Sequence, residues 1–135
     1  MTGAFRWLRL ETVIAIHGMQ ISEHGGSVGV RELGLLKSAL DRPRNLHAYG
    51  TQPDIADLAA ALAFGIVRNH PFVDGNKRTA LVCMRTFLIQ NGSDLVASQE
   101  EKFVMFWSLA EGRLNEIELA DWIRTHLQGI QEEFD

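Results

Sequence analysis

The chain has 135 residues, a length that suits one compact domain with little room for a second. Hydrophobic residues make up 46% and charged residues 22%, which argues against disordered, collagen-like and coiled-coil classes. Thirteen Lys and Arg against 17 Asp and Glu give a net charge of −4, which argues against a domain that binds nucleic acid through its phosphates.

The N-terminal half is predicted to be helical. Apolar residues at helical spacing predict a first helix over about residues 8–20, which should end by Gly25-Gly26. A shorter helix is predicted over residues 31–40, stopping before Pro43. The next helix should begin near residues 51–54, with Pro53 in its first turn. It should break at His70, because a residue that precedes proline disfavours the helical conformation.

The most apolar run covers residues 58–67 and is predicted to be a buried helix. As a helix it would span about 15 Å, roughly half of a bilayer core, so no membrane association is expected. At the N-terminus, Arg6 and Arg9 are followed by Glu11 and only a short apolar stretch, which argues against a secretory signal. Cys83 is the single cysteine, so no intramolecular disulfide can form and the cytoplasm is the expected compartment.

The C-terminal half should hold three more helices. The first starts at Gly75 or Asn76, runs to residue 90 and is closed by Asn91-Gly92. Residues 93–98 could form a short strand or hairpin. Two Ser/Asn–Glu pairs with capping-box spacing then predict helices over residues 98–110 and 115–127. Three aromatic residues at helical spacing are expected in the core: Phe103, Phe106 and Trp107. These predictions give a mainly α-helical domain over residues 1–128 and a polar C-terminal tail over residues 129–135.

Reactive and charged side chains are concentrated in residues 70–78, His-Pro-Phe-Val-Asp-Gly-Asn-Lys-Arg, between the two most apolar helices. A helix that starts at Gly75-Asn76 presents unpaired N–H groups, which suit a phosphate. Lys77 and Arg78 strengthen this interpretation, because the helix dipole disfavours cations there unless an anion offsets them. His70 can accept a proton from a hydroxyl at neutral pH, and Asp74 could hold a divalent cation.

Each residue of this segment also has a structural explanation. His70 could simply end a helix, Asp74 could be an N-cap, and Asn76 could be a turn residue. Lys77 and Arg78 could form a solvated face. Their joint occurrence favours a functional site, because the structural alternative needs a separate explanation for every position.

Other candidate sites are weaker. An isolated histidine on an apolar helix face, such as His17, is more often packed than bound to a metal. Cys83 lies among apolar residues, which raise a thiol pKa, so we expect a core residue and not a nucleophile. The Gly-rich segment 25–29 lacks the spacing of a dinucleotide-binding loop and is expected to be a turn.

Residues 70–78 resemble the signature of the Doc, or death-on-curing, branch of the Fic family, H-x-F-x-D-(A/G)-N-K-R, at every position. The resemblance extends to further positions before and after this segment: His17, Ile21, Gly26, Gly29, Arg31, Gly34 to Leu36, Ala39, Leu40, Pro43, Asn69, Ala80, Asn91, Gly92 and Ala110 to Gly112. It implies an all-α, single-domain helical bundle whose motif loop lies between two central helices.

The resemblance also implies an activity. Wider Fic relatives transfer AMP and have a glycine where this chain has Lys77, and the Doc branch presents the γ-phosphate of a reversed nucleotide instead. The implied protein is a toxin of a toxin–antitoxin module, a protein kinase that uses ATP and Mg²⁺. By resemblance its substrate is a threonine hydroxyl of elongation factor Tu, and its action arrests translation.

Site roles follow from the same resemblance. His70 would be the general base, and Asp74 would hold Mg²⁺ or assist that base. The nucleotide phosphates would be bound by the next four residues, which are Gly75, Asn76, Lys77 and Arg78.

Inhibition is expected from outside the chain. The inhibitory motif of some Fic proteins, [S/T]-x-x-x-E-[G/N], is matched here only by residues 108–112, one residue short. The resemblance therefore implies a Phd-like antitoxin with a segment that folds into a groove on the toxin. Two alternatives remain open at this point: an AMP transferase on the same fold, and a catalytically weak regulator that binds the antitoxin.

Overall fold

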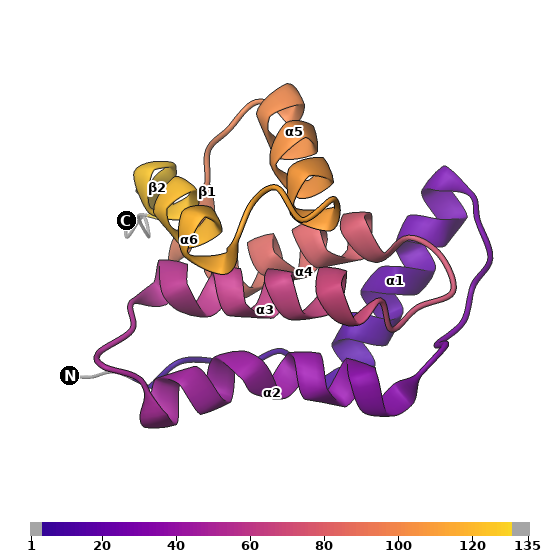
Figure 1. Cartoon of the computed structure of the whole chain (residues 1–135), viewed down its shortest axis with the longest axis horizontal. Coiled ribbons are helices and arrows are strands. Elements are labelled where there is room, and N and C mark those ends of the chain that lie inside the picture. The colour runs from indigo at the N-terminus through magenta and orange to yellow at the C-terminus, as the bar shows by residue number, and fades with distance from the viewer. Residues whose placement is uncertain (1–3, 131–135) are drawn as a thin grey trace, which may run out of the picture.

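The computed structural model describes residues 4–130, which form six α-helices and one pair of short strands (Figure 1). The elements in chain order are α1 (Leu10–His24), α2 (Leu33–Tyr49), α3 (Ile55–Asn69), α4 (Asn76–Gln90), β1 (Ser93–Leu95), α5 (Gln99–Ala110), α6 (Glu116–Thr125) and β2 (Leu127–Gly129). The all-α fold is therefore confirmed, with a single two-stranded addition among the described residues.

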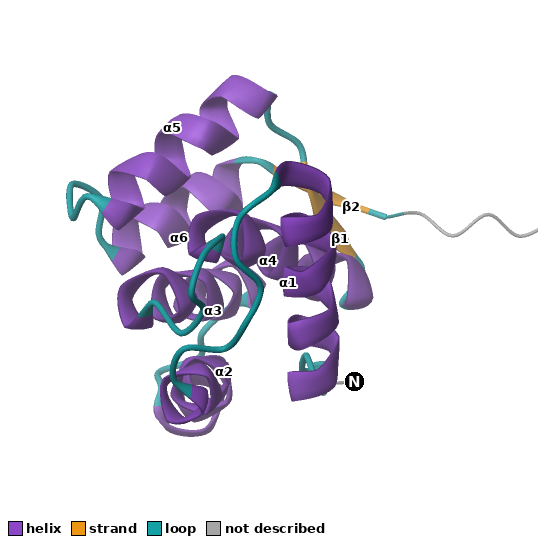
Figure 2. Ribbon diagram, turned by 90° about the vertical axis from the view of Figure 1, so that its right-hand side faces the viewer, coloured by secondary structure: helices purple, strands orange, loops and turns teal. Residues whose placement is uncertain are grey.

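Helix α3 is the centre of the bundle. It lies between α2 on one side and α6 on the other and packs alongside α4, as Figures 1 and 2 both show. Ten of its 15 residues are buried, on all sides of the helix: Ala56, Leu58 to Ala63, Gly65, Ile66 and Val67. A helix that is apolar all round belongs in a core, so the predicted buried helix is confirmed. None of the described helices is long and apolar enough to cross a membrane.

Helix α2 continues through Pro43 to Tyr49, so the predicted stop before Pro43 is wrong. Proline removes one helix hydrogen bond, but its ring here is buried on the face that packs against α3. The two helices approach closely at Gly65, where a Cβ atom would lie 2.8 Å from Arg42 Cδ and 3.2 Å from Ala39 Cα. Packing along this contact compensates for the missing hydrogen bond.

Capping boxes open three of the six helices that the structure describes. The predicted capping boxes of α5 and α6 are both present, and a third opens α3. In that third box, Asp54 accepts from the Asp57 N–H and Asp57 accepts from the Asp54 N–H. Helix α3 therefore begins at Ile55, and Pro53 precedes the helix instead of occupying its first turn. Helix α1 runs to His24 and ends at Gly25, as its glycine signal predicted.

The strand predicted within residues 93–98 is confirmed as β1, but its partner is distant. β1 pairs antiparallel with β2, with Ser93 opposite Gly129 and Leu95 opposite Leu127. Helix α6 therefore ends before residue 127, contrary to the prediction, because Leu127 joins this ladder. The folded domain continues at least to Gly129, the first residue of the expected tail, and residues 131–135 lie outside the described part of the chain.

The aromatic residues of α5 are divided between core and surface. Phe106 is buried as expected, whereas Phe103 is 63% and Trp107 44% exposed. Helix α5 packs against the bundle through the face that carries Phe106 and Leu109, and these two are its buried residues. The expected core positions of Phe103 and Trp107 are therefore wrong.

Arg124 links α6 to the start of α3. Its guanidinium donates to Asp54 at 2.7 Å and 3.1 Å and to Asp57 at 2.8 Å. The hydrogen bonds from Arg124 are the main reason that the pKa of Asp54 falls from 3.8 to about 2. This ion pair therefore depends on an ionised Asp54 carboxylate.

We expect Arg124→Met to lower the free energy of unfolding by about 1 kcal/mol or less at pH 7, because the Arg124 and Asp54 side chains are 39% and 49% exposed and solvent screens them. The folded-state pKa of Asp54 is depressed, so its contribution is present above pH 3.8 and is lost as the pH falls through about 2. Urea unfolding at pH 7 and at pH 2 measures the difference. Arg44→Met, at an exposed position of α2, is the control. A difference of equal size at both pH values would contradict the prediction.

Candidate functional site

The loop that joins α3 to α4, residues 70–75, starts with an uncommon backbone conformation. His70 adopts φ 52° and ψ 53°, in the left-handed region that few residues other than glycine occupy. Its N–H still donates to Ile66 O at 3.1 Å, so the chain turns sharply as the helix ends. The predicted break at His70 is confirmed, and the turn leaves the imidazole exposed.

A second loop, between α1 and α2, is bonded to this one through the main chain (Figure 2). Val73 N donates to Gly29 O at 3.0 Å, and the N–H groups of Arg31 and Glu32 both donate to Pro71 O. Val30 and Phe72 form an isolated antiparallel bridge. We call residues 27–32 the brace, because they hold the motif loop along its length.

The Arg31 side chain adds to the brace. Its Nε and Nη2 donate to His70 O at 2.9 Å and 2.7 Å, and Nη2 also donates to Asn69 O at 3.1 Å. Arg31 thus satisfies the carbonyl groups exposed where α3 ends, which stabilises the left-handed turn at His70. In the sequence, only the family resemblance singles out Arg31, and it implies no role for this residue.

Asp74 is held at both its carboxylate and its carbonyl. Ser27 N donates to Asp74 Oδ2 at 2.9 Å, and His17 Nε2 lies 2.9 Å from Asp74 O. A carbonyl only accepts, so Nε2 of His17 carries the hydrogen. The buried His17 ring also stacks on Phe72, with centroids 3.9 Å apart and an angle of 8°. The prediction that His17 is packed is confirmed, and no cluster of three potential metal ligands occurs among residues 4–130.

Gly75 joins this loop to α4, in a place that disfavours a side chain. Its φ of 76° is in the left-handed region, and a Cβ atom would lie 3.1 Å from Ile21 Cδ1. Both the conformation and the close approach to α1 favour glycine. Helix α4 then begins at Asn76, as predicted.

The Asn76 side chain is directed into the loop. It is 5% exposed, its Oδ1 accepts from Phe72 N and its Nδ2 donates to Phe72 O, both at 2.9 Å. These bonds use Oδ1 and one of the two Nδ2 hydrogens, which leaves the other Nδ2–H and the backbone N–H of Asn76 to contact a phosphate.

The start of α4 is electropositive. No described residue accepts a hydrogen bond from the backbone N–H groups of Asn76, Lys77 and Arg78. Nor does any carboxylate within residues 4–130 form an ion pair with the side chains of Lys77 or Arg78. Three free donors and two unpaired cations therefore meet at one helix end, an arrangement suited to a phosphate group.

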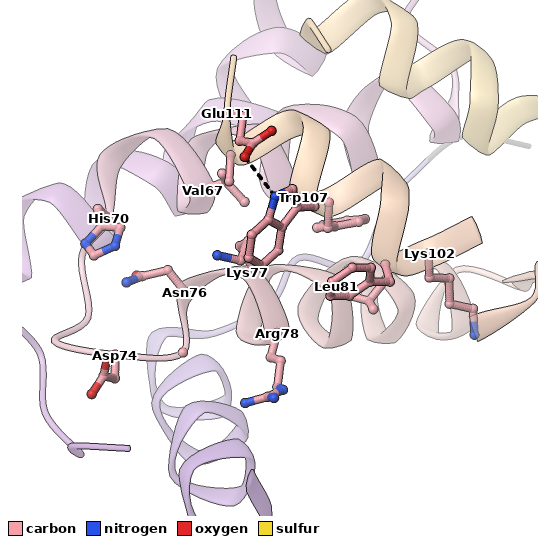
Figure 3. A pocket seen from close by; sticks show the side chains of 14 residues that line it. Val67, His70, Asp74, Asn76, Lys77, Arg78, Leu81, Lys102, Trp107 and Glu111 are labelled. Carbon is pink, nitrogen blue, oxygen red and sulfur yellow. Dashed lines mark hydrogen bonds between the residues drawn. The ribbon is translucent and has the colours of Figure 1, made fainter. Parts of the chain in front are cut away.

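These groups border a pocket of about 660 Å³ between the motif loop, α4 and α5 (Figure 3). Its volume is within the range of small-molecule sites. The polar side of the pocket is formed by the motif residues His70, Asp74, Gly75, Asn76, Lys77 and Arg78. The opposite side is formed by α5 and the residue after it, chiefly Phe103, Phe106, Trp107 and Glu111.

The structure thus brings all the predicted site residues to one pocket and adds an aromatic wall that sequence reasoning missed. Helical spacing predicts that Trp107 and Phe103 share a face of α5, but it does not show whether other elements cover that face. No hydrogen bond joins Asp74 to His70 among the described residues, and Figure 3 shows the Asp74 carboxylate pointing away from the His70 ring.

Cys83 on α4 is not part of this site. It is fully buried, and burial raises its thiol pKa to about 12. The prediction that it is a core residue is confirmed.

Comparison with known proteins agrees with this geometry. A family model described as Fic/DOC family matches residues 7–88, which include the brace and the motif loop. A protein named Toxin Doc from Mycolicibacterium smegmatis is 40% identical over 98 residues, covering 72% of this chain and 71% of the relative. A protein named Protein kinase doc from Escherichia phage P1 is 31% identical over 119 residues, covering 88% of this chain and 94% of the relative.

We expect Asn76→Ala to lower the free energy of unfolding, because it leaves the buried N–H and C=O of Phe72 unpaired. Each unpaired group costs about 1–3 kcal/mol. Chemical denaturation measures the loss, with Asn45→Ala at an exposed position of α2 as the control. A side chain that served only to contact phosphate would leave stability unchanged, so equal stability of the two variants would refute this role.

Proposed function

The chain belongs to the Fic/DOC family, and from that membership we propose that it is a toxin that phosphorylates a protein hydroxyl. The observation that carries the proposal is that six of the nine motif residues, His70 and 74–78, line one pocket at the start of α4. The names of two relatives, Toxin Doc and Protein kinase doc, support the toxin and the kinase parts respectively.

The start of α4 would bind the nucleotide phosphates. Its free N–H groups, at residues 76–78, would donate to phosphate oxygens, and the side chains of Lys77 and Arg78 would neutralise their charge. Gly75 would contribute through its backbone, because its left-handed conformation turns the chain into α4 and so sets the direction of these N–H groups. Phosphoryl transfer relies mostly on such positioning and charge neutralisation.

His70 would act as the general base. The hydroxyl oxygen of the target attacks the γ-phosphorus of ATP, the new O–P bond forms, and the bond from that phosphorus to the bridging oxygen breaks to release ADP. His70 takes the proton of the hydroxyl. Its exposed imidazole at the pocket edge is accessible to a protein substrate, and the brace fixes the backbone that carries it.

Asp74 fits a role in holding Mg²⁺. It is exposed at the pocket, and the Ser27 N–H occupies only Oδ2, which leaves the other oxygen available. Mg²⁺ sites beside nucleotides commonly use one or two carboxylates and the phosphates themselves, so a single aspartate is sufficient. The ion would supply positive charge at the phosphates, and Asp74 would set its place beside α4.

Lys77 favours phosphate transfer over AMP transfer. A lysine occupies the position where AMP-transferring relatives have glycine, so its side chain fills space next to the bound phosphates. The family resemblance associates this lysine with a nucleotide that presents its γ-phosphate.

The target and the inhibitor rest on the family resemblance. The proposed substrate is a threonine of elongation factor Tu, whose modification would arrest translation in the cytoplasm. The proposed inhibitor is a Phd-like antitoxin. The position of Glu111 is consistent with an external inhibitor. Its carboxylate accepts a hydrogen bond from Trp107 and lies 3.4 Å from Arg113, instead of contacting Arg78 of the motif.

Transfer of label distinguishes the reaction types. Purified protein, Mg²⁺ and elongation factor Tu are incubated with ATP labelled at either the α- or the γ-phosphate. We expect label on the factor from the γ position alone. Label from the α position would establish AMP transfer instead, and no transfer from either would favour a regulator that only binds its antitoxin.

His70→Ala should lower the rate of phosphate transfer by about 10²–10⁴, the usual contribution of a general base, and should abolish growth arrest on expression. His24→Ala, at the exposed end of α1, should leave both unchanged. Undiminished transfer by the His70 variant would remove this residue as the base.

A further inference from the structure

The Lys77 side chain is not free in solvent. Its Nζ lies over the ring of Trp107, 4.4 Å from the ring centroid. Figure 3 shows both side chains at the pocket. Trp107 belongs to α5, outside the residues that match the family model. We propose that Trp107, itself held by Glu111, positions Lys77 for the nucleotide phosphates, an inference that rests on the proposed function.

Lys77 needs such a partner for two reasons. Lysine has one of the largest side-chain entropies, so an unsupported ammonium would spend little time at one place. It also lies in the first turn of α4, where the helix dipole disfavours a cation. No carboxylate among the described residues pairs with it, and the face of an indole provides an alternative electrostatic attraction.

Trp107 is in turn fixed from two sides. Its Nε1–H donates to Glu111 Oε2 at 2.8 Å, a charge-assisted hydrogen bond at the edge of the ring. The Phe103 ring packs beside it, with centroids 5.3 Å apart and an interplanar angle of 30°. These contacts define the plane of the indole and leave one face to Lys77. Glu111 and Trp107 are therefore positioning residues, and Lys77 is the group that touches the phosphate.

Arg78 provides an internal contrast. It follows Lys77 in the same helical turn, but Figure 3 shows its side chain pointing in a different direction, away from Trp107. Trp107 thus acts on one of the two motif cations. Loss of its ring should weaken phosphate binding in part, through Lys77, and should leave the contribution of Arg78 intact.

A competing role for Trp107 is stacking on the nucleobase. The two roles differ in what they require of the ligand, because inorganic tripolyphosphate has the phosphates and no base. If Trp107 positions Lys77, its loss weakens tripolyphosphate and ATP equally. If it stacks on the base, ATP alone is weakened.

The experiment measures binding of ATP and of tripolyphosphate, each with Mg²⁺, to the full chain by calorimetry. We expect Trp107→Leu to weaken both about two- to fivefold, the range of a partly exposed cation–π contact. Trp107→Phe should recover part of the loss, because a ring is restored. In a Lys77→Met background, Trp107→Leu should have no further effect, since the group that it positions is gone.

A nucleotide-free measurement tests the contact itself. Proton NMR of the wild type should show the Lys77 ε-methylene protons shifted upfield by the indole ring current. Trp107→Leu should remove this shift and Glu111→Leu should reduce it, whereas Glu111→Gln, which keeps an acceptor for Nε1–H, should preserve most of it. Val104→Ala, at an exposed position of α5 that does not line the pocket, is the matched control and should change neither the shift nor either affinity.

Three results would overturn the inference: unchanged tripolyphosphate affinity in Trp107→Leu, an equal loss in the Lys77→Met background, or no upfield shift in the wild type. Failure of the proposed function has a different signature. In that case neither the wild type nor the Trp107 variants transfer phosphate, while the binding and NMR measurements still test whether Trp107 positions Lys77.

Discussion

The site depends on the hydrogen bonds between the brace, residues 27–32, and the motif loop. They join segments about 40 to 50 positions apart in the chain, and most of them involve backbone groups of the loop. Because the loop contributes carbonyl and N–H groups to these bonds, its path is fixed independently of the side chains that face the pocket. The left-handed turn at His70 is tolerated because Arg31 bonds its carbonyl directly. The His70 imidazole is therefore attached to a stretch of backbone that these hydrogen bonds hold in place.

The motif divides its residues between structure and chemistry. Phe72 and Asn76 are buried, and with His17 they close the inner side of the loop. His70, Lys77 and Arg78 extend from the same short segment toward the pocket. A signature of nine residues is therefore partly a folding signal, because the Asn76 amide holds the loop through both the N–H and the C=O of Phe72.

The aromatic wall of α5 faces the motif across the pocket, and the two sides are joined by the contact between Lys77 and Trp107. The wall comes from a part of the chain beyond the match to the family model. The pocket therefore has walls from two separate parts of the chain, which only the folded bundle brings together.

The sequence by itself determined the features that depend on neighbours within about four positions. Such local chemistry accounts for the break before Pro71, the start of α4 at Asn76 and the capping boxes of α5 and α6. The sequence also places a base, a carboxylate and two cations within one segment of nine residues. Tertiary structure alone decided the rest. Packing on α3 carried α2 through Pro43, and pairing with β1 took Leu127 out of α6. The exposure of Trp107, its contact with Lys77 and the inward direction of Asn76 depend on what each side chain meets in the folded bundle, and no helical period or capping signal encodes that.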